Sequence, residues 1–98
     1  MTRRVVFRPQ ALAELLEARR WDDERRPGLG AEFAGAVEGL VESIQRKPLS
    51  HPKVRGETRR AILRRFPYVI HFRAIEEEVI VLAVTHGRRD PGHWRSQT

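Results

Sequence analysis

The hydrophobic pattern of this 98-residue chain changes its period once, across residues 48–58. Upstream, apolar residues recur every three or four positions, which is typical of helices that bury one face. Downstream, β-branched and aromatic residues dominate short segments, which is typical of strands. The sequence therefore predicts helices followed by a sheet. The clearest helical run has its apolar residues at Leu29, Phe33, Ala36, Val37, Leu40, Val41 and Ile44.

The predicted fold is α+β, with the element order β-α-α-β-β-β. The expected elements are a strand at 5–7, a helix from Pro9 to the Pro27-Gly28 pair, a helix from Leu29 to Lys47-Pro48, a loop at 48–58, and strands at 59–64, 66–73 and 78–86. A short link joins the two helices into an antiparallel hairpin. Tight turns join the last three strands into a meander, so we expect a mainly antiparallel sheet packed against the helical hairpin. One domain is expected over residues 1–98.

Finer packing features also follow from the pattern. Gly35 and Gly39 lie four residues apart in the second helix and are expected to allow close approach of the first helix. The last strand is apolar on both faces from Val79 to Val84, so we expect it inside the sheet, with strand 5–7 as its second neighbour. The expected apolar face of the first helix consists of Ala11, Leu12, Leu15, Leu16 and Trp21.

The chain is basic, and its charge is unevenly distributed. The formal net charge is +6; residues 1–45 hold 7 Arg or Lys and 8 Asp or Glu, whereas residues 46–98 hold 12 and 5. A localised positive field of this kind attracts nucleic acid, phosphate or an acidic protein segment. Arg outnumbers Lys 17 to 2, which fits either bidentate anion recognition or a GC-rich coding bias.

Several classes of protein are excluded or disfavoured by composition. The absence of cysteine excludes disulfides, thiolate zinc sites and cysteine nucleophiles, and it fits a cytoplasmic protein. No apolar run approaches the ~20 residues that span a bilayer, and the N-terminus lacks the apolar core of a secretory signal. The four histidines show no metal-binding spacing, so neither a metal nor a cofactor is expected.

Chemically capable side chains gather in AVTHGRRDPGHW, residues 83–94. His86 ends the last strand, where it can act as a general acid or base or simply cap the strand against a carbonyl group. Trp94 can stack on a base or seal the edge of the sheet, and Tyr68 can donate a proton or pack. The arginines that can form either a phosphate-binding or a merely solubilising surface are Arg60, Arg64, Arg65, Arg73, Arg88 and Arg89.

The order of elements, the strand FPYVIHFR (66–73) and the ending AVTHGRRDP (83–91) resemble the RelE/ParE superfamily of bacterial type II toxins. The resemblance covers nearly the whole chain, and PGLGAEFAGAVEGLVESIQRKP (27–48) looks like the second helix of that family. It implies a β-α-α-β-β-β toxin, often with a short C-terminal helix, that is neutralised by an antitoxin with a commonly acidic C-terminal segment. The positive charge of residues 46–98 suits such a partner. The apolar seam beside the helical hairpin is the expected place for a segment that folds on binding.

The two branches of this superfamily differ in activity. RelE-like members cleave mRNA on the ribosome, whereas ParE-like members poison DNA gyrase. Aligning FPYVI by its Tyr puts Val69 where RelE-like toxins usually carry an Arg, and this departure removes a phosphate-stabilising cation. If the chain is a nuclease, His86, Arg64 and Arg60 are the expected catalytic residues, although a complete cleavage set is not visible.

The resemblance therefore favours a ParE-like toxin that acts by binding rather than as an enzyme. DNA gyrase is the favoured target, and a cognate antitoxin is the expected partner in a toxin–antitoxin hetero-oligomer. Two alternatives stay open: a ribosome-dependent mRNA endonuclease, and a basic module that only binds its antitoxin and operator DNA as a co-repressor. The residues expected to contact the target or the antitoxin are Arg60, Arg64, Arg65, Tyr68, Arg73, Arg88, Arg89 and Trp94.

Overall fold

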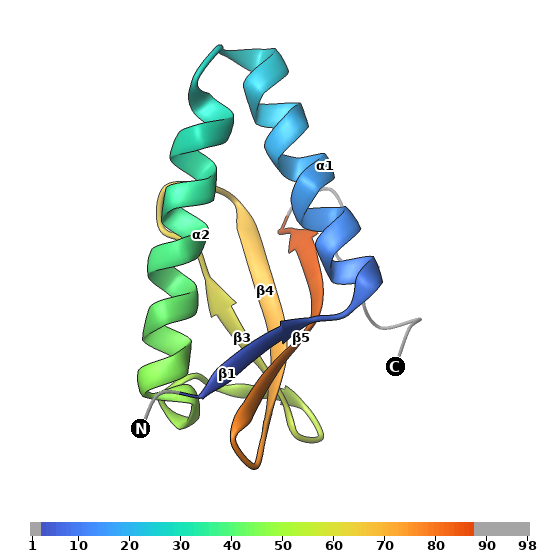
Figure 1. The fold of residues 1–98 in the computed structure, drawn as a ribbon, viewed down its shortest axis with the longest axis vertical. Helices are drawn as coiled ribbons and strands as arrows, with labels where there is room; N and C mark the ends of the chain where they lie inside the picture. The colour runs from blue at the N-terminus through green and yellow to red at the C-terminus, as the bar shows by residue number, and fades with distance from the viewer. Residues whose placement is uncertain (1–2, 88–98) are drawn as a thin grey trace.

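Two helices pack against one face of a five-stranded sheet in the computed structural model, which describes residues 3–87 (Figure 1). The elements in chain order are β1 (Arg4–Phe7), α1 (Pro9–Arg25), α2 (Leu29–Arg46), the 3-10 helix η1 (Pro48–Ser50), β2 (Lys53–Arg55), β3 (Thr58–Ile62), β4 (Tyr68–Ile75) and β5 (Glu78–His86). The predicted order β-α-α-β-β-β is confirmed. The segment 48–58 is more ordered than the predicted loop: it contains η1 and the short strand β2, because its backbone pairs with β3. The expected C-terminal helix falls outside the described residues.

The strands lie in the order β1-β5-β4-β3-β2. β1 runs parallel to β5, and every other neighbouring pair is antiparallel. The prediction that the last strand lies inside the sheet beside the first is confirmed, since β5 has β1 on one side and β4 on the other. The sheet therefore has a helix-covered face, on which α1 and α2 pack, and an opposite face.

A bulge in β5 explains how a strand that is apolar on both faces still serves a one-sided core. The register with β4 shifts between Val81 and Ala83, which leaves Leu82 as an extra residue. The extra residue moves the alternation of side chains by one position. As a result Val79, Val81 and Val84 all belong to the core on the helix-covered face.

The core is built mainly from α2 and the strands beneath it. α2 buries Phe33, Val37 and Ile44. The Phe33 ring centroid lies 5.5 Å from that of Phe66 and 5.1 Å from that of Tyr68. Burying a side chain of this kind contributes about 1.5–3 kcal/mol, so this cluster holds α2 on the sheet. The apolar stripe predicted for the second helix is therefore the buried one.

α1 faces the sheet with a different stripe from the predicted one. Its buried residues include Ala11 and Asp22, whereas Leu12, Leu16 and Trp21 are 45%, 55% and 41% exposed. The predicted apolar face is thus wrong for these three side chains. Small side chains face the sheet and bring α1 close to β5, and this rotation of the helix turns the bulkier ones outward.

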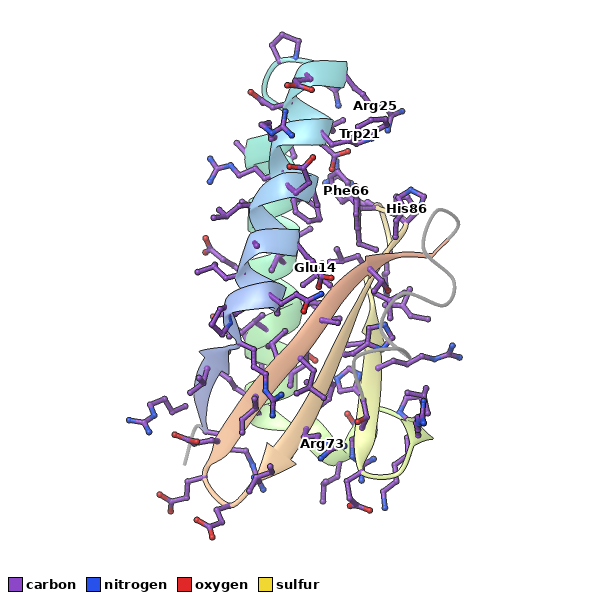
Figure 2. The ribbon with its side chains drawn as sticks, turned by 90° about the vertical axis from the view of Figure 1, so that its right-hand side faces the viewer. Glu14, Trp21, Arg25, Phe66, Arg73 and His86 are labelled. Atoms are coloured by element: carbon purple, nitrogen blue, oxygen red, sulfur yellow. The ribbon has the colours of Figure 1, made fainter. Side chains whose placement is uncertain are left out.

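Glu14 supports β5 beyond the end of β1. β1 pairs with β5 only as far as Val81. Beyond that point Glu14 Oε1 accepts the backbone N–H of Val84 at 2.8 Å, and Figure 2 shows Glu14 between α1 and β5. A carboxylate from the helix therefore supplies an acceptor where the neighbouring strand no longer can.

The two helices approach each other most closely beside the hairpin loop, at Gly30. A Cβ atom there would lie 2.8 Å from the carbonyl oxygen of Arg19, so a larger residue does not fit without movement of the backbone. Asp23 Oδ1 accepts the N–H of Gly30 at 3.2 Å and so caps the first turn of α2. The predicted close approach at Gly35 and Gly39 is wrong, because a Cβ at either position would meet nothing within 4 Å.

Candidate binding surfaces

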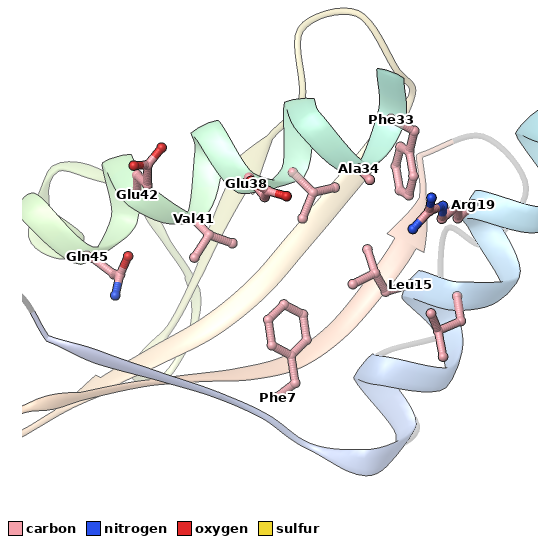
Figure 3. Close-up of a pocket in the computed structure, with 11 residues that line it drawn as sticks. Phe7, Leu15, Arg19, Phe33, Ala34, Glu38, Val41, Glu42 and Gln45 are labelled. Atoms are coloured by element: carbon pink, nitrogen blue, oxygen red, sulfur yellow. The ribbon is translucent and has the colours of Figure 1, made fainter. Parts of the chain in front are cut away.

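The two helices diverge from the hairpin loop toward β1 (Figure 1), and an open groove of about 470 Å³ lies between them (Figure 3). Its lining is mainly apolar: β1 contributes Phe7, α1 contributes Leu15, and α2 contributes Phe33 and Val41. The groove exists because α1 and α2 diverge with distance from the hairpin loop. It lies beside the helical hairpin, where the sequence predicted an apolar seam; that a partner segment binds there stays a prediction.

Exposed leucines of α1 extend the groove to the surface. Leu12 and Leu16 lie one helical turn apart. Leu16 lines both this groove and a second hollow nearer the hairpin loop, beside Arg20 and Ala31. Exposed apolar surface next to a groove is typical of a contact with another molecule. The sequence indicates this exposed apolar surface by the wide apolar arc on the first helix, because the arc is too wide to form a single buried stripe.

Charged side chains stand along the groove edges. Glu38 and Glu42 lie on the α2 edge, and Arg19 lies on the α1 edge near Phe33 (Figure 3). Toward β1, the Gln45 side chain completes the α2 edge and donates through Nε2 to the carbonyl oxygen of residue 3 at 2.7 Å. None of these edge residues was among the predicted contact residues, since an isolated charge on a helix looks the same in sequence whether or not a groove lies beside it.

His86 and Arg60, predicted to act together if the chain is a nuclease, lie on opposite faces of the sheet. His86 is opposite Tyr68 in the β4–β5 register, and the two rings meet edge to face at 5.1 Å. Because Tyr68 packs against Phe33 of α2, this pair lies on the helix-covered face. Arg60 is opposite His71, which alternates with the core residues of β4, so Arg60 belongs to the opposite face.

Two further predicted residues, Arg64 and Arg65, lie in the exposed β3–β4 turn. Arg65 forms an ion pair with Glu32 of α2 at 2.9 Å, and its guanidinium carbon lies 5.7 Å from the ring centroid of Phe66. These contacts draw Arg65 toward the helices, at the end of the sheet where Figure 2 shows Phe66 and His86. Arg65 therefore does not extend the cationic surface of the opposite face.

A buried polar pair occupies the opposite face. His71 Nε2 lies 3.0 Å from Thr85 Oγ1, and both residues are 4% exposed. Burial, and to a smaller extent the positive charge of Arg60, lower the pKa of His71 to about 4, so this imidazole is neutral at pH 7. Arg73 is half-buried, and its Nε donates to Thr58 Oγ1 at 3.1 Å. The opposite face thus offers the cations of Arg60 and Arg73 beside a neutral histidine.

The remaining expectations concern residues at the C-terminus and the other histidines. Arg88, Arg89 and Trp94 lie outside the described residues. His51 packs edge-on against Phe72 with ring centroids 5.7 Å apart, and burial followed by the charge of a nearby arginine lowers its pKa. Within residues 3–87, no three His, Asp or Glu side chains gather as a possible metal site. Neither helix in that range is long and apolar enough to cross a membrane.

The chain is similar in sequence and fold to known toxins. Residues 5–91 match the family model described as the ParE toxin of a type II toxin–antitoxin system, parDE. The chromosomal ParDE toxin–antitoxin system from P. aeruginosa shares the fold with a TM-score of 0.76 at 17% identity, covering 87% of this chain and 96% of that chain. The toxin–antitoxin complex RelBE2 from Mycobacterium tuberculosis gives a TM-score of 0.61 at 24% identity, covering 88% and 99%. Among curated proteins the chain has no match.

Proposed function

Because this chain belongs to the ParE toxin family of type II toxin–antitoxin systems, we propose that it stops growth by binding an essential target. DNA gyrase is the favoured target. The contact surface is the opposite face of the sheet, where Arg60 and Arg73 lie, together with the C-terminal segment. A cognate antitoxin holds the toxin inactive by seating a segment in the groove between α1 and α2. The observation that carries the choice of binding over cleavage is the separation of Arg60 and His86 on the two faces of the sheet.

Cleavage of RNA would require a histidine and an arginine that reach the same phosphate group. A general acid or base must come within about 3 Å of the proton that it moves, and an arginine that stabilises the same phosphate must reach the same site. The His86 ring contacts Tyr68 edge to face on the helix-covered side of the sheet, so a phosphate held by Arg60 would lie on the other side. The histidine on the side of Arg60 is His71, which is buried and has its pKa lowered to about 4.

The apolar lining of the groove favours a segment of the antitoxin as its occupant. Leu16 is 55% exposed at the edge, and the lining behind it includes Phe7, Leu15 and Val41. A segment that covers these side chains removes their apolar area from water at about 25 cal/mol per Å². Recognition of an amphipathic segment by an apolar groove is a recurrent mode of peptide binding.

The test is expression of the chain in bacteria that lack the antitoxin. We expect growth to stop, DNA double-strand breaks and the SOS response to rise, and mRNA to persist. Co-expression of the short reading frame beside its gene should restore growth. In vitro, the purified chain should inhibit supercoiling by DNA gyrase.

Two variants separate binding from cleavage. Under the proposed function, His86→Ala keeps its toxicity, whereas Arg60→Ala weakens it by removing a contact cation from the opposite face. If the chain is a nuclease, both variants restore growth and the rapid loss of mRNA disappears. If expression is harmless while the antitoxin complex still binds operator DNA, the chain acts as a co-repressor instead. Melting temperatures of both variants show whether each remains folded.

A further inference from the structure

Two carboxylates beside the groove differ from the other acidic residues of the helices. Glu38 and Glu42 are exposed, and neither forms an ion pair or a hydrogen bond with any residue in the range 3–87. This is unexpected in a chain with 19 Arg and Lys against 13 Asp and Glu. The helix carboxylates that do bind a cation or a backbone N–H in the structure are Glu14, Glu17, Asp22, Asp23, Glu24 and Glu32.

Glu38 and Glu42 both lie at the edge of the groove. Glu38 and Glu42 lie four residues apart on α2, so they are separated by about 6 Å along the helix. Both line the groove edge, and Val41 between them contributes to its apolar lining (Figure 3). An occupant of the groove therefore passes directly beside two negative charges spaced by one helical turn.

We propose that the groove takes an amphipathic helix that presents two Lys or Arg side chains, one turn apart, to Glu38 and Glu42. This inference rests on the proposed function, because the antitoxin supplies the helix. The α2 edge of the groove runs from Ala34 to Gln45, which is roughly 17 Å or three helical turns. The apolar residues of the bound helix fill the groove at i, i+3 or i+4, and i+7.

The partner segment is therefore basic along one flank. This differs from the acidic segment that suits the positive half of the chain, so the antitoxin needs two regions of opposite charge. Arg19 adds a second requirement at the hairpin-loop end of the groove, because it lines the groove near Phe33 and forms no ion pair with a described residue. An acidic residue of the partner fits beside Arg19, and basic residues fit beside Glu38 and Glu42. A helix that carries its charges in the opposite order along the groove is therefore disfavoured.

Two synthetic peptides test the charge requirement on the full chain. Both have about 14 residues, to span the groove with one turn to spare, and the same leucine stripe; one carries a Lys pair at i and i+4 and the other a Glu pair. Fluorescence anisotropy should show about tenfold tighter binding of the Lys peptide. The double variant Glu38→Lys/Glu42→Lys should reverse this preference. The control Glu76→Lys/Glu77→Lys makes the same change of charge at the exposed β4–β5 turn and should leave the preference unaltered.

The inference is overturned if the two peptides bind the wild-type chain equally, if neither binds, or if the double variant keeps the wild-type preference. Binding of the cognate antitoxin separates this failure from failure of the proposed function. Leu16→Asp places a charge at the exposed groove edge and should weaken antitoxin binding. If Leu16→Asp weakens it and the double variant does not, the groove is the antitoxin site but the charge requirement is wrong. If neither change weakens it, the antitoxin does not use the groove.

Discussion

The helices α1 and α2, of 17 and 18 residues, pack on the same face of the sheet but differ in which residues they bury. α2 buries its large apolar side chains, including Phe33 and Ile44. α1 buries small residues and the carboxylate-bearing Asp22, and leaves Leu12 and Leu16 about half exposed. The difference shows that an apolar stripe on a helix is not evidence of core packing by itself. On α2 the stripe stabilises the fold, and on α1 it borders a groove.

This division separates stability from binding. The residues that hold α2 can change little without loss of the folded state, whereas the exposed stripe of α1 contributes little to folding and is available for contact. Exposed apolar surface promotes aggregation of the chain, and a partner that covers this surface prevents the aggregation. Such a partner also stabilises the folded chain, because it binds only that state. The comparison between the helices can be tested by substitutions on each.

Phe33→Ala tests the α2 side and has the largest expected effect. Phe33 is 0% exposed and contacts both Phe66 and Tyr68, so its truncation should lower the free energy of unfolding by about 3–5 kcal/mol. This is a large share of the 5–15 kcal/mol that is typical of a domain. Urea unfolding followed by circular dichroism measures the change. A loss below about 1 kcal/mol would mean that α2 does not anchor the hairpin.

Gly30→Ala tests the contact between the helices. The added Cβ would lie 2.8 Å from the carbonyl oxygen of Arg19, and overpacking of this kind should cost about 1–3 kcal/mol. Gly39→Ala is the matched control, because a Cβ there meets nothing within 4 Å and should stabilise the helix by up to about 1 kcal/mol. Thermal unfolding of the two variants should shift in opposite directions. Shifts of the same sign would contradict the assigned contact.

The sequence predicted the helices and most strands because their hydrophobic periods are local properties. It also placed β5 beside β1, since a strand apolar on both faces needs two neighbours. The rotation of α1 was missed because Ala11 and Leu12 are both apolar, and the pattern cannot say which of the two adjacent stripes faces the sheet. That choice depends on how closely the helix approaches β5, which is a property of the packed fold.

The site was harder to predict than the fold, and His86 shows why. Its face depends on the register between β4 and β5, which a two-residue turn at 76–77 and the extra residue Leu82 determine together. A shift of one residue would put the imidazole on the opposite face. The groove-edge residues Glu38 and Glu42 were missed for another reason, because the divergence of the helices that creates the groove has no local signal.

The pH dependence of stability extends the comparison to the opposite face of the sheet, where His71 is 4% exposed. Its pKa falls from 6.5 to about 4, owing to burial and then to Arg60. The unfolded chain therefore takes up a proton at higher pH than the folded chain. The stability that the neutral His71 contributes is fully present above about pH 6.5 and is lost as the pH falls toward 4, by on the order of 3 kcal/mol. Urea unfolding at pH 7 and pH 4.5 should show this loss of stability in the wild-type chain. In His71→Gln the loss should be smaller. The same pH dependence in both proteins would contradict the role of His71.

Leu16→Ala has the smallest expected effect on stability and tests the α1 side most directly. Leu16 is 55% exposed, so its truncation should change the free energy of unfolding by less than about 0.5 kcal/mol. The same substitution at Leu63, which is 5% exposed in the core, should cost about 2–5 kcal/mol. Antitoxin affinity, measured by titration calorimetry, should respond in the opposite way to stability. Leu16→Ala should weaken binding, whereas Leu63→Ala should leave the groove and its affinity unchanged as long as the variant stays folded. If Leu16→Ala instead destabilises the chain as Leu63→Ala does, the stripe on α1 is part of the core, and the distinction between the two helices does not hold.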